Sequence, residues 1–353
     1  MHQAKPHPTP LVYVAMSGGV DSSVAAALLK ERGFRVVGVY MKPWQPRGVA
    51  CLWQEERADA LRVADALGIP LKTWDVSRAY RAKVALPMVH GYRSGRTPNP
   101  DVECNRHIKF GVFYERARRE GADYVATGHY ARIAKRTGGP ALLKAVDANK
   151  DQTYFLWGIR RAQLAHILFP IGGMTKPEVR AYARAAGLPT AEKKDSQGVC
   201  FVGPLNMKSF LASVIRPRSG VIRHRDGRVL GTHDGAAYYT IGQRHGLDIR
   251  VGGGPYYVLR TDIQKNVVIV GTDGDLDGRT ARFVRPNWLG PKPALGARVT
   301  AKIRYRTTEV PVVVTKGKLV FARAVRALTP GQSVVFFRGS RVLGGGILAA
   351  AAR

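Results

Sequence analysis

The sequence predicts an α/β fold in which a doubly wound parallel sheet is followed by two small, mainly β domains, the last of them a β-barrel. Two observations lead to this prediction. Up to about residue 205, short apolar runs alternate with stretches of helical spacing, which is typical of a parallel sheet covered by helices. Beyond that point the helical period disappears, glycine-rich turns separate short runs, and the final series has the spacing of antiparallel strands in a small barrel.

Strands and helices are expected to alternate along the first domain. Each predicted strand is a short apolar run, and the predicted helices have helical spacing and composition. Gly68 and Pro70 separate the second helix from the third strand. Ligands bind beyond the carboxyl ends of strands in such sheets, and the loops at 17–23, after Met41 and at 127–129 fall there. The expected strands are 11–16, 36–41, 71–76 and 122–126, and the expected helices are 24–32, 55–67 and 110–119.

The changes in composition also predict the domain boundaries. We expect residues 1–10 to be a disordered tail and residues 11–205 to form the first domain. Residues 206–276 then form a small central domain, and residues 277–353 form the barrel, with a linker in the Asp- and Gly-rich stretch near 275–280.

The charge balance indicates a polyanionic partner. Lys and Arg number 56 against 25 acidic residues, which leaves a net charge of +31 and a pI near 10.6. Such an excess causes self-repulsion in the folded state, so a nucleic acid is the natural partner. The alternative is a general enrichment in arginine, which would still leave a surface that attracts phosphates.

The composition argues against other classes of protein. No apolar run approaches the roughly 20 residues needed to cross a bilayer, and the opening stretch MHQAKPHPTP lacks the apolar core of a signal peptide. We therefore expect a cytoplasmic protein without membrane contact. The cysteines, Cys51, Cys104 and Cys200, are too few and of odd number for a disulfide scaffold, and no CxxC pair or His-rich spacing indicates a metal site.

The turn Ser17–Ser23, SGGVDSS, predicts a phosphate-binding site. It joins an apolar strand to a helix, and Gly18 and Gly19 let the backbone turn sharply and approach a ligand. The amides at the helix N-terminus then face an anion, which the helix dipole favours. Asp21 fits beside phosphate where it holds Mg²⁺ or caps the helix. The alternative is a capped strand-to-helix turn with glycines for packing, which the complete seven-residue string disfavours.

This string resembles the pyrophosphatase loop of the PP-loop enzymes, which cleave ATP to pyrophosphate and adenylate a substrate. It lacks the GK[ST] ending of a Walker P-loop, so transfer of the γ-phosphate is disfavoured. The resemblance implies ATP as cosubstrate, with Mg²⁺ carried by the nucleotide. Amidotransferase synthetases, argininosuccinate synthetase, tRNA lysidine synthetase and RNA thiolases all share this loop, so the loop alone does not choose among them.

Two cysteines lie in basic, turn-rich segments. Cys104 follows the irregular stretch 95–103 and is close in sequence to four basic residues, which would favour its thiolate. Cys200 follows Lys193 and Lys194 in KKDSQGVCF. A single buried cysteine is usually a small apolar residue, but two such cysteines beside an adenylating loop favour sulfur chemistry. We expect an ordered loop that displays Cys104.

With these motifs together, the chain resembles the tRNA-specific 2-thiouridylases of the MnmA family over almost its whole length. The matching motifs occur in one order along the chain: SGGVDSS, Met41–Trp44, GRTPNPDVECN (95–105), ATGHY (126–130), NKDQTYFL (149–156), KKDSQGVCF (193–201), TIGQRHGL (240–247), Arg304–Arg306 and Thr329–Ser333.

The resemblance implies a reaction on the wobble uridine, U34, of tRNA. ATP would adenylate the C2 oxygen of the uridine, and Cys200 would receive a persulfide sulfur from an upstream donor protein. Cys104 would act as nucleophile to complete sulfur release, and a Cys104–Cys200 disulfide formed during turnover would then be reduced. The products are 2-thiouridine, AMP and pyrophosphate. Whether the persulfide attacks directly or hydrosulfide is freed first stays open, and Asp101 is implied near the base.

The resemblance also implies individual contacts, residue by residue. The implied ATP contacts are Ala15, Met16, Ser17, Gly18, Gly19, Val20, Asp21, Ser22, Met41 and Gly128. The implied contacts with the target base are Asn99, Pro100 and Asp101, and those with the rest of the tRNA are His129, Lys150, Asp151, Gln152, Arg304, Tyr305 and Gln332. Lys150 and Arg304 are suited to phosphate, and Tyr305 to stacking, with packing in a strand as the alternative.

Two features of the sequence depart from the family pattern, and two rival functions stay open. Ala15 stands where the family often has glycine, the segment after Trp44 is shorter than usual, and Cys51 has no expected role. One rival is an adenylating synthetase that delivers an amine, which would keep full product formation after both Cys104→Ser and Cys200→Ser. The other is a non-catalytic RNA-binding module, whose RNA binding would be indifferent to ATP and to Asp21→Ala.

Overall fold

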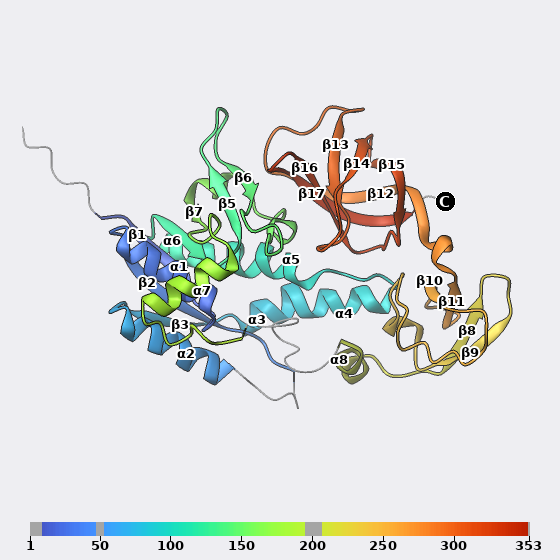
Figure 1. The fold of residues 1–353 in the computed structure, drawn as a ribbon. Coiled ribbons are helices and arrows are strands. Elements are labelled where there is room, and N and C mark those ends of the chain that lie inside the picture. Colours follow the sequence, from blue (N-terminus) through green and yellow to red (C-terminus); the bar gives the residue numbers. More distant parts are fainter. Residues whose placement is uncertain (1–8, 47–52, 195–206, 352–353) are drawn as a thin grey trace, which may run out of the picture. The chain divides into compact units, whose positions relative to one another are not determined.

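The computed structural model describes residues 9–46, 53–194 and 207–351 (Figure 1). They divide into two compact units, which are described separately. The first lies within 1–81 and 104–203, and the second within 82–103 and 204–353. The segment 82–103 therefore interrupts the first unit in sequence and packs with the β-rich part of the chain.

The first unit is built on a five-stranded sheet with the order β3-β2-β1-β4-β7, in which every neighbouring pair is parallel. The order reverses between β1 and β4, which makes their carboxyl ends the topological switch point where ligands bind in such sheets. The predicted parallel sheet is thus confirmed. The strands are β1 Leu11–Ala15, β2 Arg35–Lys42, β3 Leu71–Asp75, β4 Tyr124–Thr127 and β7 Ile167–Leu168, and β5 Ala131–Ala134 pairs antiparallel with β6 Ala141–Lys144.

Helices pack against this sheet through their apolar faces. Helix α1 buries Val24, Ala25 and Leu29 at 1% exposure or less. Helix α7 begins with a reciprocal capping box, in which Thr175 and Glu178 satisfy the first free amides. The other predicted helix, 55–67, is also present as α2. The bounds are α1 Val20–Glu31, α2 Trp53–Ala66, α3 Ser77–Tyr80, α6 Tyr114–Arg119 and α7 Lys176–Ala185, with 3-10 turns at Thr153–Phe155 and Arg161–His166.

The helix predicted over 110–119 begins earlier than expected. Helical structure starts at Pro100 with α5 (Pro100–Cys104) and continues through the π-helical turns Asn105–Phe113, which are kinked at Phe110, into α6. The sequence-based expectation that Cys104 lies in an irregular loop was therefore wrong. Proline is well suited to the first helical position, where its missing amide costs nothing, so Pro100 starts this helix rather than preventing it.

The second unit contains two β structures. A four-stranded sheet has the order β10-β11-β8-β9, with β8 and β11 parallel and the other pairs antiparallel. It is formed by β8 Gly220–His224, β9 Val229–His233, β10 Tyr257–Asp262 and β11 Val267–Gly271. Two helices, α4 Leu86–Arg93 and α8 Met207–Val214, contact the 3-10 turn Ala236–Tyr238 of this unit.

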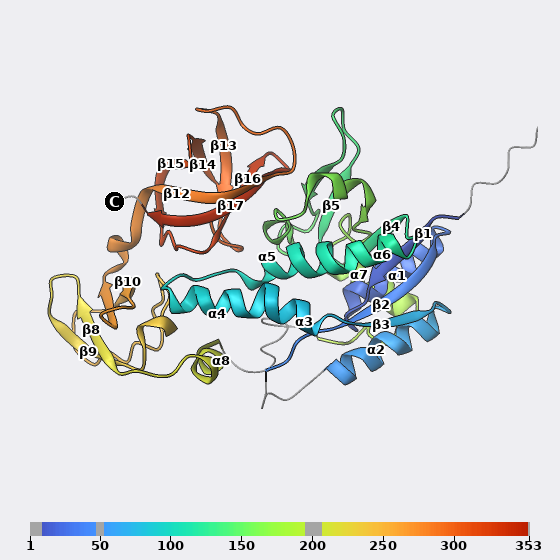
Figure 2. The ribbon, with the colours of Figure 1, turned by 180° about the vertical axis from the view of Figure 1, so that it is seen from behind.

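The last six strands form a closed antiparallel barrel (Figure 2). Their order is β12-β15-β14-β13-β16-β17, and β12 pairs with β17 to close it. Alternate residues point inward, and Phe283, Leu319 and Phe336 form part of its buried core. The predicted barrel is thus confirmed. The strands are β12 Asp277–Trp288, β13 Arg298–Lys302, β14 Val310–Val314, β15 Lys318–Arg326, β16 Ser333–Arg338 and β17 Arg341–Ala351.

In the described part of the chain, none of the helices is long and apolar enough to cross a membrane. The same residues contain no group of three or more His, Cys, Asp or Glu side chains placed to hold a metal ion.

Candidate active site

The Ser17–Ser23 turn lies at the carboxyl end of β1 and leads directly into α1. Gly19 is the N-cap of α1 and has no side chain to bond the first amides of the helix. The hydroxyls of Ser22 and Ser23 instead donate to the Gly19 carbonyl oxygen, at 3.0 and 2.9 Å. The first amides of a helix have no partner within the helix. The turn therefore leaves amide donors at the positive end of the α1 dipole, which is the arrangement that binds phosphate.

Two glycines allow this turn to pack closely. Gly18 has a φ of +72°, and a Cβ placed there would lie 2.2 Å from the backbone oxygen of Glu56 in α2. A Cβ on Gly128, just after β4, would lie 2.6 Å from the Asp21 carbonyl carbon and from the Ser22 amide nitrogen. The loops that follow β1 and β4 are thus in backbone contact, so Gly128 lies beside the Ser17–Ser23 turn, and its predicted contact with a nucleotide stays a prediction.

The carboxylate of Asp21 is held by two residues that sequence reasoning did not single out. Lys176 Nζ lies 2.7 Å from Asp21 Oδ1, and the Tyr130 hydroxyl donates to the same oxygen at 3.0 Å. The side chain of Lys176 is only 11% exposed. Both of these contacts are made by Oδ1, so the carboxylate of Asp21 is directed at a partly buried ammonium and a tyrosine hydroxyl.

A second lysine, Lys193, also contacts the turn. Lys193 Nζ donates to the Gly18 carbonyl oxygen at 3.0 Å and also forms an ion pair with Asp59 of α2. The two lysines place positive charge at two points of the turn, Asp21 and Gly18. Ala15 and Met16 are buried at the end of β1, and Met41 lies near the end of β2, beside Trp74 of β3. All of the predicted nucleotide contacts therefore lie at the carboxyl ends of β1, β2 and β4.

The segment that precedes Cys104 is shaped by Asn99. Its Oδ1 accepts hydrogen bonds from the amides of Asp101, at 3.1 Å, and Val102, at 3.3 Å. Asn99 therefore caps α5, which accounts for the helix that the sequence did not predict. Cys104, at the end of α5, is 8% exposed, whereas Asp101 is half-buried. Cys200 and Cys51 lie outside the described residues, so the predicted Cys104–Cys200 pair has no described geometry.

The candidate RNA contacts of the first unit lie after β4 and β6. Asp151 is buried and accepts hydrogen bonds from the Ala145 amide and the Thr153 hydroxyl, both at 3.0 Å on Oδ1. Gln152 accepts one from the Tyr130 amide at 2.9 Å. Lys150 is half-buried. These contacts fix the shape of the 147–153 loop, and the predicted RNA contacts of these residues stay predictions.

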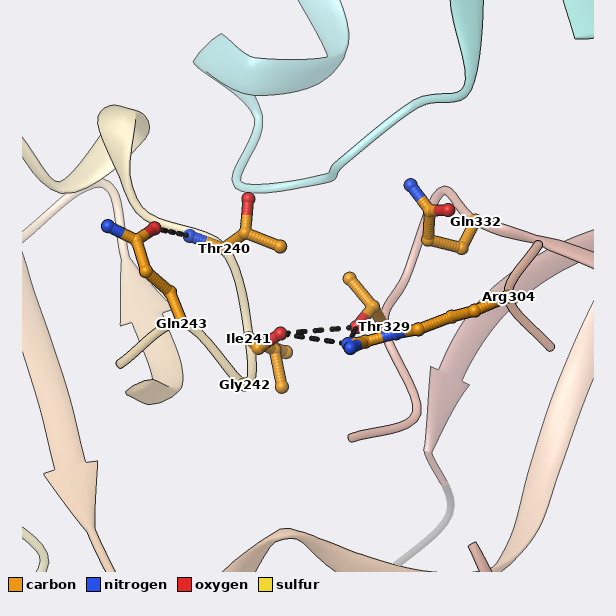
Figure 3. Close-up of a pocket in the computed structure, with 7 residues that line it drawn as sticks. All are labelled: Thr240, Ile241, Gly242, Gln243, Arg304, Thr329 and Gln332. Carbon is orange, nitrogen blue, oxygen red and sulfur yellow. Dashed lines mark hydrogen bonds between the residues drawn. The ribbon is translucent and has the colours of Figure 1, made fainter. Parts of the chain in front are cut away.

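In the second unit, Arg304 and Gln332 line a cavity of about 390 Å³, shown in Figure 3. The Arg304 guanidinium donates to the carbonyl oxygens of Ile241 and Ala327, both at 3.1 Å, and to the Thr329 hydroxyl at 2.9 Å. Tyr305 is half-buried beside the guanidinium of Arg306, 6.0 Å from its ring centre. The cavity is lined by Thr240, Ile241, Gly242, Gln243, Arg304, Thr329 and Gln332.

Similarity to known proteins extends over almost the whole chain. Family models match residues 11–204 (tRNA methyl transferase HUP domain), 208–272 (tRNA methyl transferase PRC-barrel domain) and 279–348 (aminomethyltransferase beta-barrel domain). The tRNA-specific 2-thiouridylase MnmA of Geobacillus thermodenitrificans is 47% identical over 97% of this chain and 95% of its own. The chain belongs to the tRNA-specific 2-thiouridylase (MnmA) family.

A second relative belongs to the same family, and a solved structure shows a more distant likeness. The tRNA-specific 2-thiouridylase MnmA of Listeria monocytogenes serovar 1/2a is 47% identical over 96% of this chain and 94% of its own. A solved 4-thiouridine synthetase–RNA complex with bound ATP is 21% identical over 56% of this chain and 46% of its own, with a TM-score of 0.39. This last likeness is confined to about half of the chain and concerns the fold alone.

In this member of the 2-thiouridylase family, the residues that sequence reasoning missed come from distant parts of the chain. Lys176 and Tyr130 meet Asp21 across 155 and 109 sequence positions. The pattern Thr-x-x-Glu with proline in the first turn indicates a helix start at 175–178. It does not indicate that this helix start lies beside the Ser17–Ser23 turn. Lys193 lies in the KKDSQGVCF motif, where we related it only to Cys200.

His129 is buried beside two aromatic rings and a lysine. It is 7% exposed between the rings of Phe110 and Phe169. Lys109 Nζ lies 3.3 Å from its Nε2, and Thr127 Oγ1 lies 2.6 Å from its Nδ1. Because the ammonium of Lys109 can only donate, Nε2 accepts and the proton is on Nδ1. Burial, and next the charge of Lys109, lower the pKa of His129 well below its usual 6.5.

The burial of His129 should therefore reduce the stability of the fold in acid. Below a pH of about 6.5 the unfolded histidine binds a proton that the folded one does not, so the free energy of unfolding falls by up to about 1.4 kcal/mol per pH unit. We expect the thermal midpoint to fall more between about pH 7.5 and pH 5.5 in the wild type than in His129→Gln. Replacement of the exposed His90 by Gln is the control, and parallel pH curves for wild type and His129→Gln would contradict the expectation.

Proposed function

We propose that this protein catalyses the ATP-dependent 2-thiolation of the wobble uridine, U34, of tRNA. The observation that carries the proposal is the amide-lined turn Ser17–Ser23 at the start of α1, in contact with Gly128 at the switch point of the sheet. Membership of the 2-thiouridylase family supplies the reaction, and the net charge of +31 suits an RNA substrate.

The residues present fit a nucleotide triphosphate. The turn offers amide donors at a helix N-terminus and the exposed hydroxyl of Ser17, and Lys176 and Lys193 both contact it. Asp21 is the carboxylate available for Mg²⁺, in exchange for its ion pair with Lys176. The bound Mg²⁺ would supply neutralising charge to the phosphates. The chain's own contribution is to hold the α-phosphate in place. Its amides and lysines would also donate hydrogen bonds to the leaving pyrophosphate and neutralise its charge.

The proposed chemistry proceeds in two stages. The C2 oxygen of U34 attacks the α-phosphate of ATP, and pyrophosphate leaves. Sulfur from a persulfide on Cys200 then attacks C2, and the bond from C2 to the adenylated oxygen breaks, which releases AMP. Where the persulfide attacks directly, the Cys104 thiolate attacks the Cys200 sulfur, the electron pair of the S–S bond passes to the sulfur on C2, and a Cys104–Cys200 disulfide forms. A dithiol reductant restores both thiols.

Several parts of this proposal rest on the sequence resemblance. These are the role of Cys200, the upstream persulfide donor protein, the target-base contacts of Asn99, Pro100 and Asp101, and the cytoplasmic location. The RNA contacts proposed for the two units are His129, Lys150, Asp151, Gln152, Arg304, Tyr305 and Gln332.

Mass analysis of tRNA tests the proposal. The purified protein is incubated with unmodified tRNA, ATP, Mg²⁺ and a persulfide source, and the RNA is then digested to nucleosides. We expect 2-thiouridine at position 34, with AMP and pyrophosphate formed in equal amounts, and none of these products without ATP. An unchanged wobble uridine in the complete mixture would overturn the proposal. An amine in place of sulfur would favour an aminating synthetase.

A further inference from the structure

Thr97 lies where three segments of the second unit meet. Its amide donates to the Pro330 carbonyl oxygen at 2.9 Å, and its own carbonyl oxygen accepts from Gln332 Nε2 at 2.8 Å. Its hydroxyl lies 3.1 Å from that of Thr240. All three polar groups of Thr97 are therefore bonded to two other segments, the turn 240–243 and the barrel loop 329–332. In Figure 3 the pale cyan ribbon of the Thr97 segment passes Thr240 and Gln332.

The contact with the barrel loop is between backbones. Gly331 has a φ of +94°, and a Cβ placed there would lie 2.9 Å from the amide nitrogen, carbonyl carbon and carbonyl oxygen of Thr97. Such a distance is shorter than van der Waals contact, so the two segments approach as closely as they do only because residue 331 is glycine.

Arg304 joins the two segments that hold Thr97. Its guanidinium donates to Ile241 in the turn and to Ala327 and Thr329 at the barrel loop. One planar donor group thus fixes the turn and the loop relative to each other. Thr97 is hydrogen-bonded both to the turn 240–243 and to the barrel loop 329–332.

We propose that Thr97 is a positioning residue, and that the barrel loop 329–332, braced by Arg304 and Thr240, fixes the segment that carries Asn99 and Asp101. Thr97 lies two positions before Asn99, which caps α5, and four before Asp101. The inference rests on the proposed function for the meaning of Asp101. It also gives Gln332 and Arg304 a role that needs no RNA. Their hydrogen bonds would hold the segment 97–101 in place before any substrate binds.

Amide hydrogen exchange without tRNA or ATP tests this inference. In Gln332→Ala the Thr97 carbonyl oxygen loses its donor, and we expect the amides of 97–103 to exchange roughly tenfold faster, as for the loss of one hydrogen bond of about 1.4 kcal/mol. Thr97→Val should have a similar effect, and Thr97→Ser, which keeps the hydroxyl, should restore wild-type exchange. A residue that only contacts RNA would leave this exchange unchanged, and that result would overturn the inference.

A pair of glycine variants provides a second test. Gly331→Ala should displace Thr97 and increase exchange over 97–103, whereas Gly227→Ala should not, because Gly227 has a similar φ of +99° but nothing within 4 Å of its Cβ position. Thermal midpoints show whether each variant is folded. Equal exchange in both variants would contradict the inference, and if Gly331→Ala does not fold, Gln332→Ala decides.

Kinetics then separate positioning from RNA binding. For Thr97→Val, which changes no proposed RNA contact, we expect kcat for thiolation to fall by roughly tenfold, with the KM for tRNA nearly unchanged. A rise in the KM of Thr97→Val with kcat unchanged would overturn the positioning role. Because the exchange measurements need no turnover, they remain decisive for the segment even if the protein does not thiolate tRNA.

Discussion

Replacing Gly18 with alanine should abolish ATP-dependent thiolation. Gly18 combines a φ of +72° with a Cβ position 2.2 Å from the backbone oxygen of Glu56. An alanine there is strained by its backbone and also displaces either the turn or α2, so the amides that face the phosphates lose their alignment. We expect kcat/KM for ATP to fall by at least about a hundredfold, as is typical when preorganised phosphate or oxyanion donors are lost. Release of AMP and pyrophosphate measures this directly.

Gly33→Ala is the matched control for this variant. Gly33 follows the same helix, α1, and has a φ of +80°, but nothing lies within 4 Å of its Cβ position. It therefore shares the backbone strain without the collision. We expect Gly33→Ala to keep nearly full ATP cleavage, with only a lower thermal midpoint. If Gly18→Ala cleaved ATP as fast as Gly33→Ala, the turn would not be the nucleotide site.

Cys104→Ser should eliminate 2-thiouridine while leaving adenylation intact. In the proposed chemistry the Cys104 thiolate acts after pyrophosphate has left, and a serine hydroxyl does not attack a disulfide or persulfide sulfur at neutral pH. We expect at least about a thousandfold loss of thiolated tRNA, as for removal of a covalent nucleophile. A single-turnover burst of pyrophosphate should remain.

The matched control is Cys51→Ser, since Cys51 has no role in the proposed reaction. It should keep both the pyrophosphate burst and the thiolated product. Full product formation by Cys104→Ser would contradict the sulfur-transfer role. Loss of the pyrophosphate burst as well would instead place Cys104 at the adenylation step.

Local patterns in the sequence predicted most of the fold, because strands, helices and the phosphate loop are each encoded by neighbouring residues. The runs at 11–16 and 36–41 correspond to β1 and β2, and the turn Ser17–Ser23 starts α1 as expected. The error at Cys104 has a local cause. Asn99 and Pro100 were interpreted as irregular, although the same pair, as N-cap and first helical residue, is a helix start.

The partners of these residues could not be predicted in the same way. Lys176 lies 155 positions from Asp21, and nothing in a single sequence relates a lysine at a helix start to a loop that far away. The same holds for Thr97 and Gln332, which were assigned to different parts of the molecule. Side chains of this kind are brought together by the packing of whole elements, which depends on tertiary structure rather than on local propensity.

The closing of the barrel has a consequence for how the protein is made. β12 pairs with β17, joining Ala281 to Ala351, so the barrel closes only after residue 351 has been synthesised. The hydrogen bond from Gln332 to the Thr97 carbonyl oxygen forms only after Gln332 has been synthesised, 235 positions later in the chain. The Ser17–Ser23 turn is synthesised early in translation, whereas the barrel loop 329–332, which bonds Thr97, is synthesised late. A chain that is terminated early would therefore keep the turn and lack the support from the barrel.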